Sequence, residues 1–244
     1  MTAKGSHGDE LIVEPMGGEF IVWRCLHGGP LTRESIDRPA HHPLIDWPST
    51  RKRNLPLLRK LVGTYGSCAI LARDGGRVVG TLRFYPMELC SFGEAGAGFC
   101  LQQGAPAGPS EGLADRSWPE RDALRERTLF VHCLMIAAPE GEPGRYRRQG
   151  LGTRMARELV RWARAEGWEA IEATAYEEVP WLYAIAGVAG RRFWEKLGFR
   201  VVRADTEAGM TGQILEDVRR SAVAAGIPAE KAANRYAMRL DLLP

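Results

Sequence analysis

The sequence lacks the features that mark secreted, membrane-spanning and zinc-binding proteins. Its five cysteines are odd in number and form no Cys-x-x-Cys pair, which argues against a disulfide framework or a structural zinc site. Residues 1–10 contain no apolar core of a secretory signal, and the apolar run at residues 129–138 is too short to cross a bilayer. We therefore expect a cytoplasmic protein with no membrane partner and no metal.

The charge of the chain is also nearly balanced. The formal net charge is +3, from 33 Lys and Arg against 30 Asp and Glu. A charge this small does not predict a polyanion-binding protein, so nucleic acid is not an expected partner and any basic site must be local. Three cysteines in apolar runs (Cys25, Cys68 and Cys133) are interpreted as small core residues, and Cys90 and Cys100 as free thiols.

The order of predicted elements indicates one α/β domain over residues 1–244. A mixed central sheet flanked by helices is expected, with an inserted loop at 86–128 and a helical insertion at 205–234 before the last strand. Strands are predicted at 19–26, 67–85 (a hairpin around Asp74-Gly75-Gly76), 129–136, 170–176, 200–204 and 236–242. Helices are predicted within 30–65, with Asn54 as a cap, and at 150–166, 189–199 and 212–225.

One stretch, RYRRQGLGTRM at residues 145–155, concentrates arginine and glycine directly before a helix. The first N–H groups of a helix are unpaired and favour anions, and Gly150 and Gly152 allow a phosphate to approach the backbone. Neither GxxxxGK[ST] nor a complete GxGxxG is present, and Tyr146 is the only aromatic residue among the arginines. The stretch therefore predicts a phosphate site, with an exposed basic turn as the alternative.

The same stretch carries a resemblance to a known family. Arg147-Arg148-Gln149-Gly150-Leu151-Gly152 is similar to the R/Q-x-x-G-x-G/A motif of the GCN5-related N-acetyltransferases (GNAT), and FWEKLGF at 193–199 resembles the family's (F/L)YxKxGF segment. The resemblance is specific over residues 129–204, weaker over 19–85, and does not cover 86–128.

The resemblance implies a GNAT-like fold that uses acetyl-CoA to acetylate an amine. It places the CoA pyrophosphate on the amides of residues 148–153 and the pantetheine along a strand edge. The implied cofactor-binding residues are Leu134, Met135, Ile136, Arg147, Arg148, Gln149, Gly150, Leu151, Gly152, Thr153, Phe193 and Trp194. Trp194 stands where the family often has a tyrosine acid, so Tyr176 and Tyr183 become alternative proton donors.

His132 is the candidate catalytic residue. It is expected on one strand face with Phe130, Leu134 and Ile136, where a neutral imidazole accepts the amine proton. A structural histidine in the core is the alternative. Glu177 and Glu178 could attract a cationic amine or form a polar turn, and the adjacent His41 and His42 are interpreted as loop residues.

The leading hypothesis is N-acetyl transfer to a primary amine of a small molecule or peptide. A non-catalytic acyl-CoA-binding module is the alternative, motivated by Trp194. Acetylation of charged tRNA, as in some toxin relatives, would need a broader basic surface. The sequence identifies neither the acceptor nor the oligomeric state, so a homodimer stays open.

Overall fold

The computed structural model describes residues 11–26, 29–39, 46–89, 118–138, 144–207 and 209–243. They form a seven-stranded sheet in the order β1-β2-β3-β4-β5-β7-β6. Every neighbouring pair is antiparallel except β4 and β5, which run parallel. The mixed α/β sheet expected from the sequence is confirmed.

The elements follow one another in the order that the sequence predicts from the hairpin onward. The strands are β1 (Ile12–Pro15), β2 (Ala69–Asp74), β3 (Arg77–Pro86), β4 (Thr128–Ile136), β5 (Ala170–Tyr176), β6 (Arg200–Thr206) and β7 (Asn234–Asp241). The α-helices are α1 (Arg33–Ile36), α2 (Trp47–Tyr65), α4 (Leu151–Ala165), α5 (Pro180–Ala186), α6 (Arg191–Glu195) and α7 (Gly212–Ala224). Short 3₁₀ turns lie at Met87–Leu89, Arg121–Ala123 and Ala229–Lys231.

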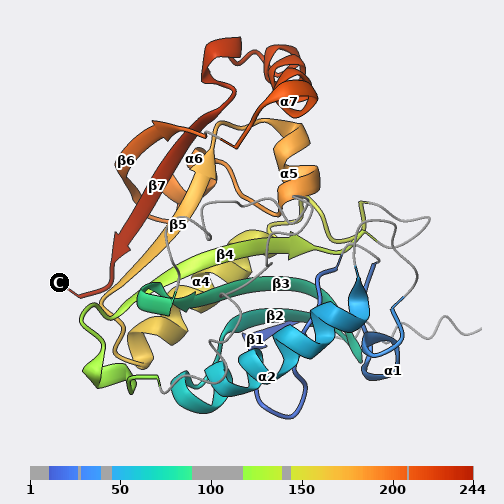
Figure 1. Ribbon diagram of the computed structural model, residues 1–244, viewed down its shortest axis with the longest axis vertical. Coiled ribbons are helices and arrows are strands. Elements are labelled where there is room, and N and C mark those ends of the chain that lie inside the picture. Colours follow the sequence, from blue (N-terminus) through green and yellow to red (C-terminus); the bar gives the residue numbers. More distant parts are fainter. Residues whose placement is uncertain are drawn as a thin grey trace, which may run out of the picture.

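Two helices cover opposite faces of the β1–β4 half of the sheet, α2 on one side and α4 on the other (Figure 1). Helix α4 buries an apolar stripe that includes Leu151, Met155, Leu159 and Trp162. It packs tightly against the sheet at Gly80, where an added Cβ would lie 2.8 Å from the sulfur of Met155. Because glycine has no side chain, α4 can pack close to β3 at this position.

The prediction of a strand at 19–26 is wrong. These residues follow a bent path without strand pairing, although Phe20, Ile21, Val22 and Trp23 are buried. Side chains replace a neighbouring strand as hydrogen-bond donors: Arg83 Nη2 donates to the carbonyls of Val22 and Arg24, at 2.9 and 2.8 Å. The apolar and β-branched residues of this segment therefore indicate that it is buried, but they do not indicate strand pairing.

The role of Asn54 as a helix cap is also wrong, because α2 begins earlier. Asp46 caps the helix by accepting a hydrogen bond from the Ser49 N–H at 3.2 Å, and Pro48 lies in the first turn. Asn54 is buried inside the helix and donates to the Trp23 carbonyl at 3.2 Å. Pro56 is accommodated in the helix interior despite the lost backbone bond.

The predicted helical insertion builds a small core of its own. Side chains of α5 and α7 pack at the far ends of β5 and β7, the upper part of Figure 1. Its buried members are Tyr176, Val179, Leu182, Val188, Met210, Val218, Ala222, Ala232 and Ala233. Helix α5 was not predicted, since PWLYAIA is short and uniformly apolar. Most of the predicted 86–128 insertion, with Cys90 and Cys100, lies outside the described residues.

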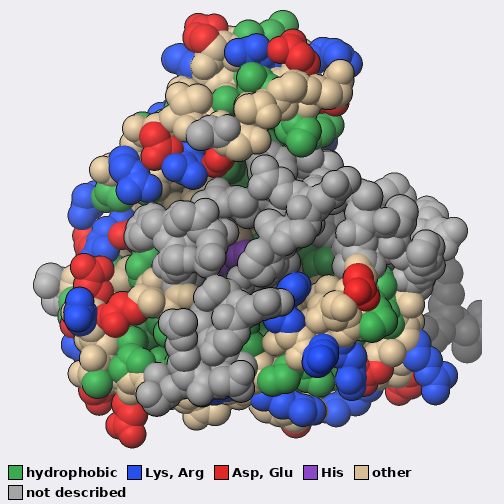
Figure 2. Space-filling model, in the orientation of Figure 1, with side chains coloured by type: hydrophobic (Ala, Val, Ile, Leu, Met, Phe, Trp, Pro, Cys, Tyr) green, Lys and Arg blue, Asp and Glu red, His purple; other side chains and the backbone are tan. Residues whose placement is uncertain are grey.

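The surface carries charges of both signs. Figure 2 shows basic and acidic side chains interspersed around α7 and along the β6–β7 edge. This mixture agrees with the small net charge of the sequence. Among the helices of the described residues, none combines the length and apolar character needed to cross a bilayer.

Replacement of Arg83 by methionine should destabilise the protein by about 2–5 kcal/mol, because two buried carbonyls lose their donor. Urea unfolding would measure the loss. The matched control is Arg220→Met on the exposed face of α7, which should change the free energy of unfolding by less than about 0.5 kcal/mol. Equal effects of the two substitutions would contradict this role for Arg83.

Candidate active site

The central feature of the site is a parting of two strands. Parallel pairing between β4 and β5 runs only from Thr128 and Ala170 to Val131 and Ala173. Strand β4 then continues to Ile136 and β5 to Tyr176 without pairing to each other. We call the space between these unpaired halves the β4–β5 gap. Along it, β4 has an edge without a partner strand, whose backbone groups can bond to another segment or to a ligand.

A β-bulge lies at the point where the gap opens. In the pairing of β3 with β4, Arg83 faces Cys133 and the next residue, Phe84, faces Val131, so His132 is the extra residue. The bulge breaks the alternation of side chains. Leu134 and Ile136 point toward Gly152 of α4, whereas the His132 ring lies 5.5 Å from the ring of Tyr85. The expectation that His132 shares a face with Leu134 and Ile136 is therefore wrong.

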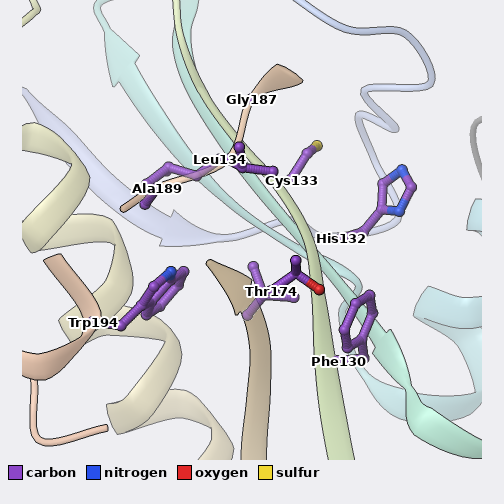
Figure 3. Close-up of a pocket in the computed structure, with 10 residues that line it drawn as sticks. Phe130, His132, Cys133, Leu134, Thr174, Gly187, Ala189 and Trp194 are labelled. Carbon is purple, nitrogen blue, oxygen red and sulfur yellow. The ribbon is translucent and has the colours of Figure 1, made fainter. Parts of the chain in front are cut away.

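His132 is half-buried on its side of the sheet, where it packs against Tyr85. Its imidazole points away from Trp194 in Figure 3, on the side of Phe130. Burial, together with the positive charge of Arg83, lowers the pKa of His132 from 6.5 to about 4. The ring is therefore neutral at pH 7 and has a lone pair that can accept a proton.

A connecting segment, Gly187–Gly190, fills the β4–β5 gap. The Leu134 N–H donates to the Gly187 carbonyl at 2.7 Å, and Gly190 forms a bridge with Tyr176 at the end of β5. Gly187 has φ +60°, and an added Cβ would lie 3.1 Å from Met135 Cγ. The segment thus occupies the strand edge that the family resemblance assigns to pantetheine. By alternation along β4, the Ile136 N–H points to the same side.

A small cavity remains between this segment and the two strands. Its volume is about 10 Å³, room for about one water molecule. Its lining comes from β4, β5, the Gly187–Gly190 segment and α6 (Figure 3): Phe130, Val131, His132, Cys133, Leu134, Thr174, Gly187, Val188, Ala189 and Trp194. The structure thus brings the predicted residues His132, Leu134 and Trp194 to one cavity.

A second part of the site lies at the N-terminus of α4. Gly150 adopts φ +76° with open space around the position of a Cβ, and no side chain caps the helix. The N–H groups of Leu151, Gly152 and Thr153 have no backbone acceptor among the described residues. An added Cβ on Gly152 would lie 3.4 Å from Leu134 and 3.6 Å from Phe193, so this end of α4 meets β4 and α6 directly.

The turn before α4 contains two residues in the left-handed conformation. Arg148 has φ +58°, the one positive φ of a non-glycine residue in the described chain, and it precedes Gly150 with a positive φ of its own. Left-handed residues in such a turn direct consecutive N–H groups into a concave surface. Arg147, Arg148 and Gln149 are exposed there. The observed geometry fits a phosphate group held by backbone amides.

Two residues of the basic stretch hold the turn in place through contacts with Asp74. Arg145 Nη2 lies 3.2 Å from Asp74 Oδ2, and the Tyr146 hydroxyl donates to the same carboxylate. Because Asp74 ends β2, these contacts fix the turn to the β2–β3 hairpin. Arg145, although part of the basic stretch, thus forms an ion pair with a carboxylate of the fold.

The other polar candidates have structural partners. Tyr176 is buried and donates to Glu207 Oε2 at 3.0 Å, with its pKa raised by burial and by Glu207. Tyr183 has its pKa raised to about 12 by burial and by Glu178, and it does not line the cavity. Glu177 accepts from Tyr236 at 2.6 Å. The structure brings neither tyrosine into the cavity beside His132.

Glu178 serves the start of α6, where it accepts a hydrogen bond from the Arg192 N–H at 2.7 Å. The cysteines Cys68 and Cys133 are buried, and burial raises the pKa of both thiols. The described residues contain no group of His, Cys, Asp and Glu arranged to hold a metal. His41 and His42 lie outside them.

Sequence reasoning missed Thr174 and the Gly187–Gly190 segment. Thr174 lies in a strand recognised only by its alternation, and the IAGVAG stretch carries no charged or aromatic residue that would mark it as functional. The one available indication was its two closely spaced glycines, which permit a close approach of backbone to backbone.

Comparison with known proteins finds matches among solved structures only. No family model matches the sequence, and no curated protein matches it significantly. Solved structures do match at low identity. A GNAT-family acetyltransferase from Streptococcus pneumoniae is 14% identical, with 96% of this chain and 100% of that chain covered and a TM-score of 0.49.

Two further matches have similar values. The apo form of a mutant agmatine N-acetyltransferase is 15% identical, with coverage of 96% and 100% and a TM-score of 0.49. The protein yncA from Salmonella typhimurium, with its cofactor acetyl-CoA, is 16% identical, with coverage of 82% and 75% and a TM-score of 0.44. Because the identities and TM-scores are low, these matches assign no role to any residue of this chain.

The lowered pKa of His132 has a measurable consequence for stability. The pKa is about 4 when folded and about 6.5 when unfolded, so on acidification the unfolded chain binds the proton first. This contribution to the free energy of unfolding is complete above pH 6.5 and is lost as the pH falls toward 4, by up to about 3 kcal/mol.

Urea unfolding at several pH values between 7 and 4 tests this linkage. The wild-type protein should lose more stability on acidification than His132→Gln, which has no imidazole to titrate. Parallel pH dependences of the two proteins would contradict a lowered pKa at His132.

Proposed function

We propose that the protein is an N-acetyltransferase that transfers an acetyl group from acetyl-CoA to a primary amine of a small molecule or peptide. The observation that carries the proposal is the combination of two features. An uncapped, glycine-flanked helix N-terminus stands beside the β4–β5 gap, and a neutral histidine lies where the gap opens. The sequence motif that resembles the GNAT family lies in this turn.

The phosphate end of acetyl-CoA would be held by the start of α4. The N–H groups of Leu151, Gly152 and Thr153 are directed out of the helix end, and the helix dipole favours a negative charge there. Arg147 and Arg148 add positive charge on the exposed turn. Phe193 and Leu134 close the floor beside Gly152.

The acyl end would lie along the edge of β4. The N–H groups of Leu134 and Ile136 face the β4–β5 gap, and the first of them is bonded to Gly187. The Gly187–Gly190 segment and an acyl arm therefore compete for the same edge. Binding would replace the Gly187 carbonyl by a carbonyl of the ligand, which conserves the hydrogen bond of Leu134.

Acetyl-CoA supplies an acetyl group activated as a thioester, and the chain supplies the base. His132 is neutral at pH 7, so its free ring nitrogen can take the proton that the acceptor amine must lose on attack. Backbone N–H groups at the bulge and along the β4 edge can stabilise negative charge on a carbonyl oxygen.

A binding module without turnover is the second candidate function. The observations that favour it are the small cavity and the positions of the two tyrosines, neither of which lines it. Loss of acetyl-CoA in the presence of a broad panel of amines separates the two functions, because a binding module would retain the acetyl-CoA intact.

The turn before α4 should set the affinity for the phosphates of CoA. Arg147→Glu is expected to raise the dissociation constant for CoA at least about tenfold, since it places a negative charge beside the proposed phosphate site. Isothermal titration calorimetry would measure it. The control Arg220→Glu should leave the affinity unchanged, and pantetheine, which has no phosphate, should bind both variants equally.

Unchanged CoA affinity in Arg147→Glu would contradict the proposed phosphate site. If wild-type protein shows no heat of binding with CoA or acetyl-CoA, the proposed function itself is wrong.

His132→Gln should lower kcat by about 10²–10⁴-fold with a reactive amine, because glutamine cannot accept a proton. Stopped assays of free thiol release would measure the rate. Affinity for CoA, measured by calorimetry, should stay within about threefold of wild type, since His132 lies away from the α4 turn. A rate within twofold of wild type would contradict a role as base.

A further inference from the structure

Trp194 presents an unpaired donor to the cavity of the proposed site. Its side chain is 1% exposed, and its Nε1–H has no hydrogen-bond acceptor among the described residues. A buried N–H without an acceptor costs about 1–3 kcal/mol, so such groups are rare in folded proteins. An acceptor that enters the cavity would remove this cost.

The packing around Trp194 fixes the direction of this donor. Phe193 meets the indole edge-on with ring centroids 5.0 Å apart, and Phe199 packs at 4.9 Å. In Figure 3 the indole nitrogen lies on the side of the ring that faces Ala189 and the cavity. The ring therefore holds its N–H in place before any ligand arrives.

The opposite wall of the cavity is the bulged part of β4. Val131, His132, Cys133 and Leu134 line it, and Thr174 closes it from β5. His132 points to the far side of β4, away from Trp194 (Figure 3). A group lying across the bulge would thus have a base on one side and an N–H donor on the other.

We propose that the Trp194 Nε1–H donates a hydrogen bond to the sulfur of the acyl thioester and stabilises the thiolate that leaves. This inference rests on the proposed function and adds a catalytic residue to it. The amine nitrogen bonds to the acyl carbon as the carbon–sulfur bond breaks, and the bonding pair stays on sulfur. The amine proton goes to His132, and Trp194 keeps its own proton.

An indole suits this role because it donates a hydrogen bond without being an acid. A thiol has a pKa of about 8.5, so its anion is a stable leaving group near neutral pH and needs stabilisation more than a proton. A hydrogen bond to a charged acceptor is stronger than one to a neutral acceptor, and the bond is therefore strongest when the thiolate has formed.

The test compares Trp194→Phe with Trp168→Phe. Both substitutions remove a buried indole N–H that has no described acceptor, but Trp168 lies in the main core beside Tyr65 and does not line the cavity. Phenylalanine preserves an aromatic ring at each position. A general effect of losing a buried indole should therefore appear in both variants.

The first readout is the pKa of the thiol of CoA bound to each protein, followed by the ultraviolet absorbance of the thiolate. Trp194→Phe should raise this pKa by about one unit, a tenfold change in the proton dissociation constant. Trp168→Phe should leave it at the wild-type value. No difference between Trp194→Phe and wild type, or an equal shift in both variants, would overturn the proposal.

The second readout uses the wild-type protein and needs no variant to fold. The indole N–H resonance of Trp194, assigned through the backbone, should move downfield when CoA is added and stay near its free position with desulfo-CoA. A resonance that does not move at saturating CoA overturns the proposal for Trp194 alone. Absence of CoA binding overturns it together with the proposed function.

Turnover supplies a third readout. Trp194→Phe should lower kcat by about 10- to 100-fold and leave KM for acetyl-CoA within about threefold, since the bond strengthens as the thiolate forms. A rise in KM with unchanged kcat would overturn a role in stabilising the leaving group.

Discussion

The site depends on the loss of pairing between β4 and β5 after Val131 and Ala173. Continued pairing would have bonded the edge of β4 to its neighbour and left no backbone group for a ligand. The bulge at His132 lies at the same position, and it turns His132 toward one face and Leu134 toward the other. The bulge thus places the His132 side chain, the proposed base, on the face of the sheet opposite to the Leu134 side chain.

The Gly187–Gly190 segment shows how the fold satisfies this edge in the absence of a partner strand. Its carbonyl at Gly187 bonds to Leu134, and its other end bridges to β5. The small core of α5 and α7 holds Val188, so the insertion between β6 and β7 supports the segment. The insertion therefore bears on how readily the gap opens, which links the least typical part of the chain to the site.

Much of the fold was predictable because its elements have strong periodicity. Helix α4 carries a clear apolar stripe, and β5 alternates without interruption, so both were predicted within one residue of their ends. The strand at 19–26 was wrong because side chains of Arg83 and Asn54 satisfy its backbone, a long-range arrangement that local composition does not encode. Helix α5 was missed because a uniformly apolar heptapeptide has no period.

The candidate site was predictable in part. The glycines and arginines before α4 identified the turn from residue type and spacing alone, whereas the bulge at His132 depends on the register of β3 and could not be read from β4. The unpaired N–H of Trp194 likewise emerges only from tertiary packing.

A crystal structure with CoA bound tests the central claim most directly. The account predicts phosphate oxygens on the N–H groups of Leu151, Gly152 and Thr153, and a broken Leu134–Gly187 hydrogen bond with the arm of CoA in the β4–β5 gap. CoA bound elsewhere, or bound with the Leu134–Gly187 bond intact and the gap still filled, would contradict it.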